Sequence, residues 1–181
     1  MKTRGTIKIF VLCIAFADSP FSNNANEIDS KIFGVGSPSA NPYESLRSFY
    51  QRSSYNQLDI TGNVLGWYTT PYSRDAVAQT SAGRDSVIKD ALRYYDSAGH
   101  DFSQYDGDAD GVVDGFIVLY TGPNNGVFWW AYKTGFSDAT FTLDGKRLNP
   151  YVWQFGKQHC AGLLGRQLQM GLSLRCPLFD P

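Results

Sequence analysis

Four carboxylates stand immediately before a wholly apolar run, and this juxtaposition constrains the fold more than any other feature of the sequence. Residues 105–115 read YDGDADGVVDG, and residues 116–120 read FIVLY. A short apolar run that follows turn-forming residues predicts a strand buried on both faces. The acids repel one another at neutral pH, so a fold that gathers them needs a compensating charge. A bound cation is the first candidate.

The apolar run at residues 7–17 has two interpretations. It is rich in Ile, Val and Phe, which favours a buried strand. The basic residues before it and the Ala-Phe-Ala sequence at 15–17 are also typical of a secretory signal peptide with its cleavage site. Composition alone does not decide between the two.

Two main helices are expected farther along the chain. The first covers residues 41–54, where Asn41 can cap the helix, Pro42 suits its first turn and Glu44 completes a capping box. The second covers residues 83–99, where apolar residues recur at helical spacing and a glycine ends the pattern.

The remaining segments are expected to form strands and loops. Residues 18–42 are polar and contain Pro and Gly, which predicts a long loop or lobe that crosses the surface. Residues 57–71 follow a β pattern around a Gly-Asn pair at 62–63, which is interpreted as a turn. Residues 127–153 are rich in aromatic residues and are predicted to be β, with Asp-Gly at 144–145 as a hairpin turn.

The order of these elements predicts one mixed α/β (α+β) domain over residues 1–155. A chain of 181 residues with 43% hydrophobic and 15% aromatic residues is long and apolar enough to fold around a core. The net charge of −1, without a basic stripe, argues against nucleic acid as a partner. No apolar run reaches the roughly 18 residues of a membrane span. Residues 156–181 fit the plan poorly, because glycines interrupt their apolar pattern.

The acidic loop matches the first half of a calcium-binding loop, D-x-D-x-D-G. Calcium prefers oxygen ligands that converge on one point, and alternate acids in a tight loop supply them. The predicted ligands are the carboxylates of Asp106, Asp108, Asp110 and Asp114, the last directly or through water, and the backbone carbonyl of Val112.

The calcium pattern is incomplete. An EF-hand needs a bidentate Glu at its twelfth position, where this chain has Ile117 at the start of the apolar strand. Any further ligands must therefore come from elsewhere in the chain. The alternative is a solvated acidic turn that binds no ion, in which Asp and Gly serve the shape of the backbone. Zinc and magnesium are less favoured, since His100 is the one histidine nearby and magnesium rarely takes an all-protein cage.

No catalytic residue is predicted. The chain has two histidines, His100 and His159, and lacks the motifs H-E-x-x-H and G-x-S-x-G as well as a phosphate-binding loop. Sequence neighbours such as His159 and Cys160 do not usually face each other as a catalytic pair. Cys13 is expected to be a buried free thiol, whereas Cys160 and Cys176 can pair only in an oxidising compartment.

Five segments agree, in order, with the sequence pattern of one family. They are IKIFVLCIAFADSPFS, SLRSFYQRSSYNQLDITGNVLGWYTTP, RDSVIKDALRYYD, DFSQYDGDADGVVDGFIVLYTG and LDGKRLNPYVWQ. Through these segments, about residues 7 to 154, the chain resembles the immune inhibitor A-like (InhA-type) secreted zinc metallopeptidases. Serial agreement of this kind is more specific than the acidic loop alone.

The resemblance implies the N-terminal part of a zincin-like α/β peptidase domain, with the acidic loop as a structural calcium site. In the intact family, zinc-bound water hydrolyses peptide bonds of protein or peptide substrates, and the enzymes are extracellular. The resemblance also makes residues 7–17 the first core strand rather than a signal peptide. It leaves open whether the gene product starts at Met1 or upstream of it.

The chain departs from the family after YVWQ, where family members carry H-E-x-x-H on a helix. Residues 158–181 read QHCAGLLGRQLQMGLSLRCPLFDP. HCAGLLG is a broken relic of a sequence such as HEAGHLLG, or the reading frame shifts after about Gln158, or the likeness is a coincidence of small apolar residues. All three interpretations leave the chain without the glutamate base and the two histidine ligands of zinc hydrolysis.

The favoured function is therefore that of a member or fragment of a zinc metallopeptidase family, inactive because the zinc motif is missing. The alternative is a non-catalytic, calcium-stabilised extracellular binding module. In that alternative an aromatic contact surface is formed by Trp129, Trp130, Tyr132 and Trp153. Core packing is the competing role for these aromatic residues, and it is the favoured one.

Overall fold

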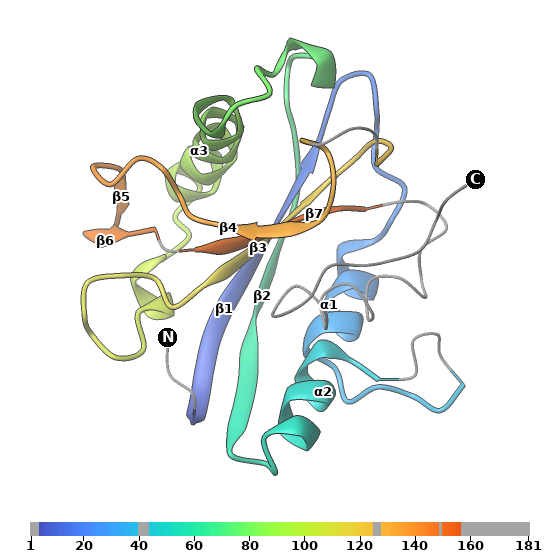
Figure 1. Cartoon of the computed structure of the whole chain (residues 1–181), viewed down its shortest axis with the longest axis vertical. Coiled ribbons are helices and arrows are strands. Elements are labelled where there is room, and N and C mark those ends of the chain that lie inside the picture. The colour runs from blue at the N-terminus through green and yellow to red at the C-terminus, as the bar shows by residue number, and fades with distance from the viewer. Residues whose placement is uncertain (1–3, 40–43, 125–127, 149, 157–181) are drawn as a thin grey trace.

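The computed structural model describes residues 4–39, 44–124, 128–148 and 150–156, which form a mixed β-sheet with α-helices on both faces (Figure 1). The five-stranded sheet has the order β2-β1-β3-β7-β4, and β5 and β6 form a separate hairpin. In chain order the elements are β1 (Gly5–Ala15), α1 (Ala25–Phe33), α2 (Leu46–Ser53), β2 (Leu58–Thr69), α3 (Ser81–Ser97), β3 (Phe116–Tyr120), β4 (Tyr132–Thr134), β5 (Thr142–Leu143), β6 (Lys146–Arg147) and β7 (Tyr151–Phe155). Strands β1, β2, β3 and β7 are parallel, and β4 is antiparallel to β7. The predicted mixed α/β fold is confirmed, with three α-helices where two main helices were expected.

Strand β1 lies inside the sheet, between β2 and β3. Every residue from Phe10 to Ala15 is 0% exposed, so both faces of the strand are covered. The strand interpretation of residues 7–17 is therefore confirmed. Cys13 is the buried free thiol that the sequence predicted, and burial raises its pKa to about 12.

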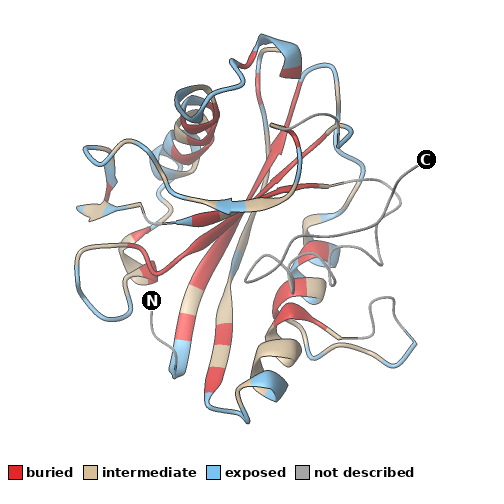
Figure 2. Ribbon diagram, in the orientation of Figure 1, coloured by how far each residue is buried: buried red, intermediate tan, exposed pale blue. Residues whose placement is uncertain are grey.

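Alternate residues of β1 enter two hydrophobic cores, one on each face of the sheet. Figure 2 shows that this strand is buried along most of its length. The larger core contains the buried face of α3 and takes Phe10 and Leu12 from β1. The smaller core contains the buried faces of α1 and α2 and takes Ile9 and Val11. The period of two along a strand sends successive side chains to opposite faces, which explains why this run is apolar throughout.

Helix α1 corrects the prediction of a continuous loop over residues 18–42. Asn24 caps the helix by accepting the backbone N–H of Asn26 at 2.9 Å. Ile28 and Ile32 stand one turn apart and are buried in the smaller core. Most of the residues around these two isoleucines are polar, so the hydrophobic pattern of the sequence did not predict this short helix.

Helix α2 begins at a different cap from the one predicted. Ser45 accepts the backbone N–H of Ser48 at 3.0 Å, so the helix starts after it. Glu44 does not act as the predicted capping-box residue at the third helical position, because it precedes the cap; it pairs with Arg52 at 2.8 Å. The expected cap and first-turn residues at 41–42 lie outside the described residues.

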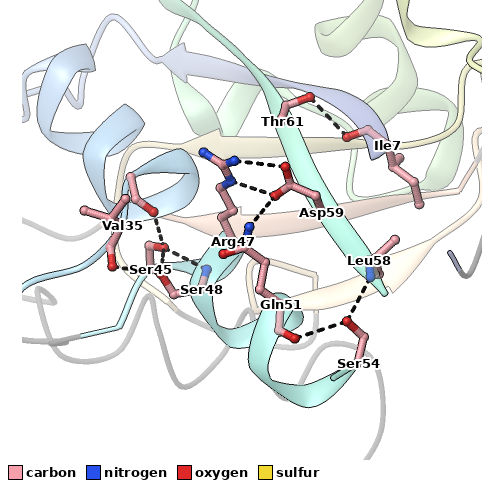
Figure 3. Close-up of polar contacts among 11 residues, drawn as sticks. Ile7, Val35, Ser45, Arg47, Ser48, Gln51, Ser54, Leu58, Asp59 and Thr61 are labelled. Atoms are coloured by element: carbon pink, nitrogen blue, oxygen red, sulfur yellow. Dashed lines mark hydrogen bonds and ion pairs between the residues drawn. The ribbon is translucent and has the colours of Figure 1, made fainter. Parts of the chain in front are cut away.

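A polar cluster holds α2 against the edge strand β2 (Figure 3). Arg47 donates two hydrogen bonds to the carboxylate of Asp59, at 2.7 and 2.9 Å, and Gln51 donates a third at 2.9 Å. These hydrogen bonds lower the pKa of Asp59, and the bond from Arg47 has the largest effect. The pair is about a third exposed, so its electrostatic contribution to stability is modest.

Gly62 lies inside β2 and is not part of a turn, which corrects the interpretation of the Gly-Asn pair at 62–63. Strand β2 runs without interruption past this residue, which pairs with Ile9 of β1. A Cβ on Gly62 would lie 1.8 Å from the carbonyl oxygen of Ile9. Glycine is needed here because a neighbouring backbone approaches closely.

The other expected elements appear where the sequence placed them. Strand β3 coincides with the predicted segment, and helix α3 begins and ends two residues before the predicted helix over 83–99. The turn between β5 and β6 has positive φ at Asp144 and Gly145. In the part of the chain that the structure describes, no helix has the length and apolarity needed to cross a membrane. His159, Cys160 and Cys176 lie outside that part. The division of the chain after residue 155 therefore stays a prediction, and the pairing of the two cysteines stays open.

Candidate metal site

The acidic loop joins a short 3₁₀ helix, η2 (Ser103–Tyr105), to β3, and both of its ends are fixed in the core. Tyr105 is 0% exposed and packs against Phe10 of β1 at a ring distance of 4.9 Å. At the other end, Val113 is also 0% exposed. The apolar residues that flank the acids therefore hold the loop in place while its middle faces solvent.

Asp106 organises the turn of the loop. Its carboxylate accepts the backbone N–H groups of Asp110 and Gly111, both at 3.0 Å. Ala109 and Gly111 have positive φ, which lets the chain fold back over this side chain. The carboxylate itself is 0% exposed, although it belongs to a loop at the surface.

One carboxylate oxygen from each of Asp106, Asp108 and Asp110 lies within 4.8 Å of the other two. Asp108 and Asp110 are exposed, and Asp110 also accepts the backbone N–H of Val112 at 2.8 Å. Among the described residues, this is the one group of three or more acidic, histidine or cysteine side chains that is close enough to share an ion. The alternate spacing of the acids thus brings three oxygens together.

Asp114 takes a different position from the three alternate acids. Its side chain is nearly buried and accepts the backbone N–H of Gly107 at 3.1 Å. Its own N–H donates to the carbonyl of Tyr105 at 2.8 Å, which closes the base of the loop. Val112, whose carbonyl is the fifth predicted ligand, forms an isolated bridge with Arg147.

The hairpin of β5 and β6 packs against the acidic loop, a contact that sequence reasoning missed. Backbone bonds join Val113 to Arg147 at 2.9 Å and Arg147 to Gly111 at 3.0 Å. Asp144 in the hairpin turn accepts the backbone N–H of Phe102 at 2.6 Å. The Asp-Gly signal predicted the hairpin but contained no information about what it would contact.

The hairpin also supplies a base to the acidic loop. Lys146 donates from Nζ to Asp106 at 2.8 Å. This hydrogen bond, together with those from the N–H groups of Gly111 and Asp110, lowers the pKa of Asp106. One of the three converging negative charges is therefore balanced by a lysine, and those of Asp108 and Asp110 face the solvent without a described base beside them.

His100 does not belong to the acidic group. Its Nε2 atom lies 2.9 Å from the hydroxyl of Tyr105, and its ring packs on Phe102 with the centroids 4.8 Å apart. Burial lowers its pKa, so the imidazole favours its neutral form. The three converging acids therefore present oxygen ligands alone, which suit calcium better than zinc.

The aromatic surface of the alternative function is not present as a unit. Trp129 and Trp153 are 2% and 0% exposed and belong to the larger core. Trp130 is 48% exposed, and Tyr132 is half-buried. The prediction of core packing is thus confirmed for Trp129 and Trp153, which are too deeply buried to form part of a contact surface.

The fold and the loop define a mixed α/β protein with an oxygen-rich candidate cation site. No family model matches the chain. The sequence is 23% identical over 192 residues to Immune inhibitor A from Bacillus thuringiensis subsp. alesti, an alignment that covers 81% of this chain. It covers 28% of the relative, so the chain spans little more than a quarter of that protein's length. The similarity supports a distant relationship.

Proposed function

We propose that this chain forms the sheet-bearing N-terminal part of a zincin-like metallopeptidase domain, and that residues 1–181 do not hydrolyse peptide bonds themselves. The observation that carries the proposal is the alignment with Immune inhibitor A over 81% of the chain. The mixed sheet, with four parallel strands and an antiparallel edge strand, is consistent with an α/β peptidase scaffold. An extracellular location follows from the secreted family that the sequence resembles.

The proposed lack of hydrolysis rests on the missing zinc ligands. A catalytic zinc needs about three protein ligands and acidifies a bound water toward neutral pH. The sequence has two histidines and no H-E-x-x-H motif, and His100 is engaged with Tyr105. Without the metal, no group in the described residues replaces the zinc-bound nucleophile.

We also propose that the acidic loop binds a structural calcium ion through Asp106, Asp108 and Asp110, with the Val112 carbonyl and Asp114 completing the protein's contribution. Calcium holds oxygens at about 2.3–2.6 Å, so two ligands on one ion lie no more than about 5 Å apart. The 4.8 Å limit on the three carboxylate oxygens meets this condition. An ion would also offset the repulsion between Asp108 and Asp110.

A protein or peptide is the proposed partner class. Strand β4 is at the edge of the sheet and pairs with β7 on one side alone within the described ranges. An extended peptide can add to such an edge through backbone hydrogen bonds. The exposed Lys133 at the middle of β4 leaves room for a polar or acidic peptide side chain.

Metal analysis combined with a proteolysis assay tests the proposal. After dialysis against calcium and zinc together, the full chain should retain about one calcium and no stoichiometric zinc. It should leave casein uncleaved. The double variant Asp108→Ala, Asp110→Ala should lose the calcium, whereas the exposed-acid control Asp75→Ala, Asp96→Ala should keep it. Stoichiometric zinc with chelator-sensitive cleavage would overturn the inactivity, and calcium retained by the loop variant would overturn the site.

A further inference from the structure

A pocket of about 480 Å³ lies where the loops after β1, β3 and β7 meet. Its lining includes Asp18 and Ser19 from the loop after β1, Thr121 and Gly122 after β3, and Gly156 after β7. The volume is in the range of small-molecule pockets. This pocket is separate from the acidic loop, which precedes β3 at the opposite end of that strand.

The pocket is lined by the loops that follow β1 and β3, and the connections of the sheet diverge after these two strands. The chain leaves β1 through α1 and α2 and returns as β2 on one side, whereas it leaves β3 toward β7 on the other side. The two strands are parallel neighbours, so their carboxyl ends meet at one edge. In open α/β sheets, ligands bind in the crevice outside the carboxyl ends at such a divergence.

Hydrogen bonds make the floor of the pocket rigid. Thr121 Oγ1 accepts the N–H of Phe16 at 3.1 Å and donates to the carbonyl of Ser19. The N–H of Gly156 donates to the carbonyl of Tyr120 at 2.7 Å. These hydrogen bonds join the three segments to one another.

One wall of the pocket is aromatic. Phe21 and Trp67 stack with their centroids 5.2 Å apart and their planes 7° from parallel. The indole of Trp67 donates to the carbonyl of Asn23 at 2.8 Å, which fixes the pair in place. Phe21 is nevertheless 47% exposed, so a large apolar surface is held in an open position beside the pocket.

One acidic side chain belongs to the described part of the lining. Asp18 is the one ionisable residue among the described lining residues, and Arg74 anchors it by donating its backbone N–H at 3.0 Å. The guanidinium of Arg74 donates to the carbonyl of Pro123 at 2.6 Å, lies 4.7 Å from the ring centre of Trp129 and packs beside the backbone of Gly122. An anchored carboxylate beside an open aromatic face suits a cation on an apolar stem.

We propose that this pocket binds the side chain of a lysine or arginine presented by a protein or peptide. Its alkyl stem lies along Phe21 and its charged end reaches Asp18. The proposal is independent of the peptidase relationship, because it concerns binding and not hydrolysis, and of the calcium loop, because the two sites share no residue.

Titration of the ¹⁵N-labelled full chain, followed by the indole N–H signal of Trp67, tests the proposal. Nα-acetyl-lysine methylamide should shift this signal saturably. The norleucine analogue has nearly the same stem without the charge and should bind about threefold to fivefold more weakly, as expected for one partly exposed ion pair. The lysine probe should weaken when salt is raised to about 0.5 M, whereas the norleucine probe should not.

Two variants and their controls complete the test. Asp18→Asn keeps an acceptor for the Arg74 N–H but removes the charge, so it should bring lysine binding down to the norleucine level. Phe21→Ala should abolish the shift for both probes, and the control Asp96→Asn, on α3, should change nothing. Equal binding of the two probes to the unmodified chain, lysine binding without salt dependence, or tighter binding of a neutral sugar such as glucose would overturn the proposal.

Discussion

Asp106 organises the acidic loop through hydrogen bonds that need no bound ion. Its carboxylate gathers two backbone N–H groups and the ammonium of Lys146, and it is itself hidden from solvent. Asp108 and Asp110 lie outside this arrangement and face water. The three acids of the repeat therefore differ in role, which their regular spacing did not reveal.

The lowered pKa of Asp106 predicts an acid-dependent loss of stability. A carboxyl group whose folded pKa is below its unfolded value, about 3.9, stabilises the fold at higher pH. That stability is fully present above about pH 4 and is lost as the pH falls through the folded pKa. Urea unfolding measured without calcium should show that Asp106→Asn lowers the free energy of unfolding at pH 6 and has progressively less effect below about pH 4.

Lysine variants identify the cause of this pH dependence. Lys146→Met removes the first contributor to the lowered pKa and should raise the pH at which stability is lost. Lys133→Met, at the exposed middle residue of β4, should leave the loss of stability at acid pH as in the unmodified chain. If the free energy of unfolding falls at the same acid pH in Lys146→Met and in the unmodified chain, Lys146 does not set the pKa of Asp106.

At the scale of elements, Gly62 shows where two strands permit no side chain. A Cβ there would lie 1.8 Å from the Ile9 carbonyl oxygen and 2.8 Å from the ring of Phe33. Gly62→Ala should therefore separate β1 from β2 and cost about 3 kcal/mol or more of unfolding free energy. The matched control is Gly115→Ala, whose Cβ would meet its nearest neighbour at 3.9 Å. Denaturant unfolding of both variants tests this, and equal stabilities would contradict it.

The sequence predicted elements whose signal is local and missed those that depend on a distant partner. The stripe of α3 and the apolar run of β3 needed no knowledge of their neighbours, and both were found. The role of Gly62 depends on a carbonyl of another strand, so the residue was mistaken for part of a turn. At the acidic loop, the converging aspartates were predictable from spacing, whereas Lys146 comes from a hairpin about 40 residues farther along the chain.

At the scale of the whole molecule, buried polar networks join elements that are far apart in sequence. Arg84 on α3 donates to the hydroxyls of Tyr151 on β7 and Tyr132 on β4, both at 2.6 Å. Asp85 accepts the backbone N–H of Ser137 at 2.7 Å. These contacts tie α3 to the β4 edge of the sheet, and in the same way Lys146 and Arg147 tie the β5–β6 hairpin to the acidic loop. Unfolding is therefore expected to be a single cooperative transition of the described part.

Calcium should raise the stability of this whole unit if the acidic loop binds it. An ion that binds the native state alone contributes RT ln(1 + [L]/Kd), about 2.7 kcal/mol at a hundredfold excess over Kd. For a domain of this size, that corresponds to a rise of about 5–10 °C in Tm. The rise should be seen in a thermal melt of the full chain with calcium against chelator. It should reach the same value by near-UV and far-UV circular dichroism, because the loop is anchored in the core through Tyr105 and Val113.

The variant Asp108→Asn, Asp110→Asn separates this effect from general ion effects. It should lose the response to calcium, and in chelator it should be at least as stable as the unmodified chain, because two neighbouring negative charges are gone. The control Asp75→Asn, Asp96→Asn removes two exposed charges elsewhere and should keep the full response. A calcium-dependent rise of equal size in the loop variant would place the ion outside the loop. No rise in the unmodified chain would leave the acids as a solvated turn held together by Asp106 and Lys146.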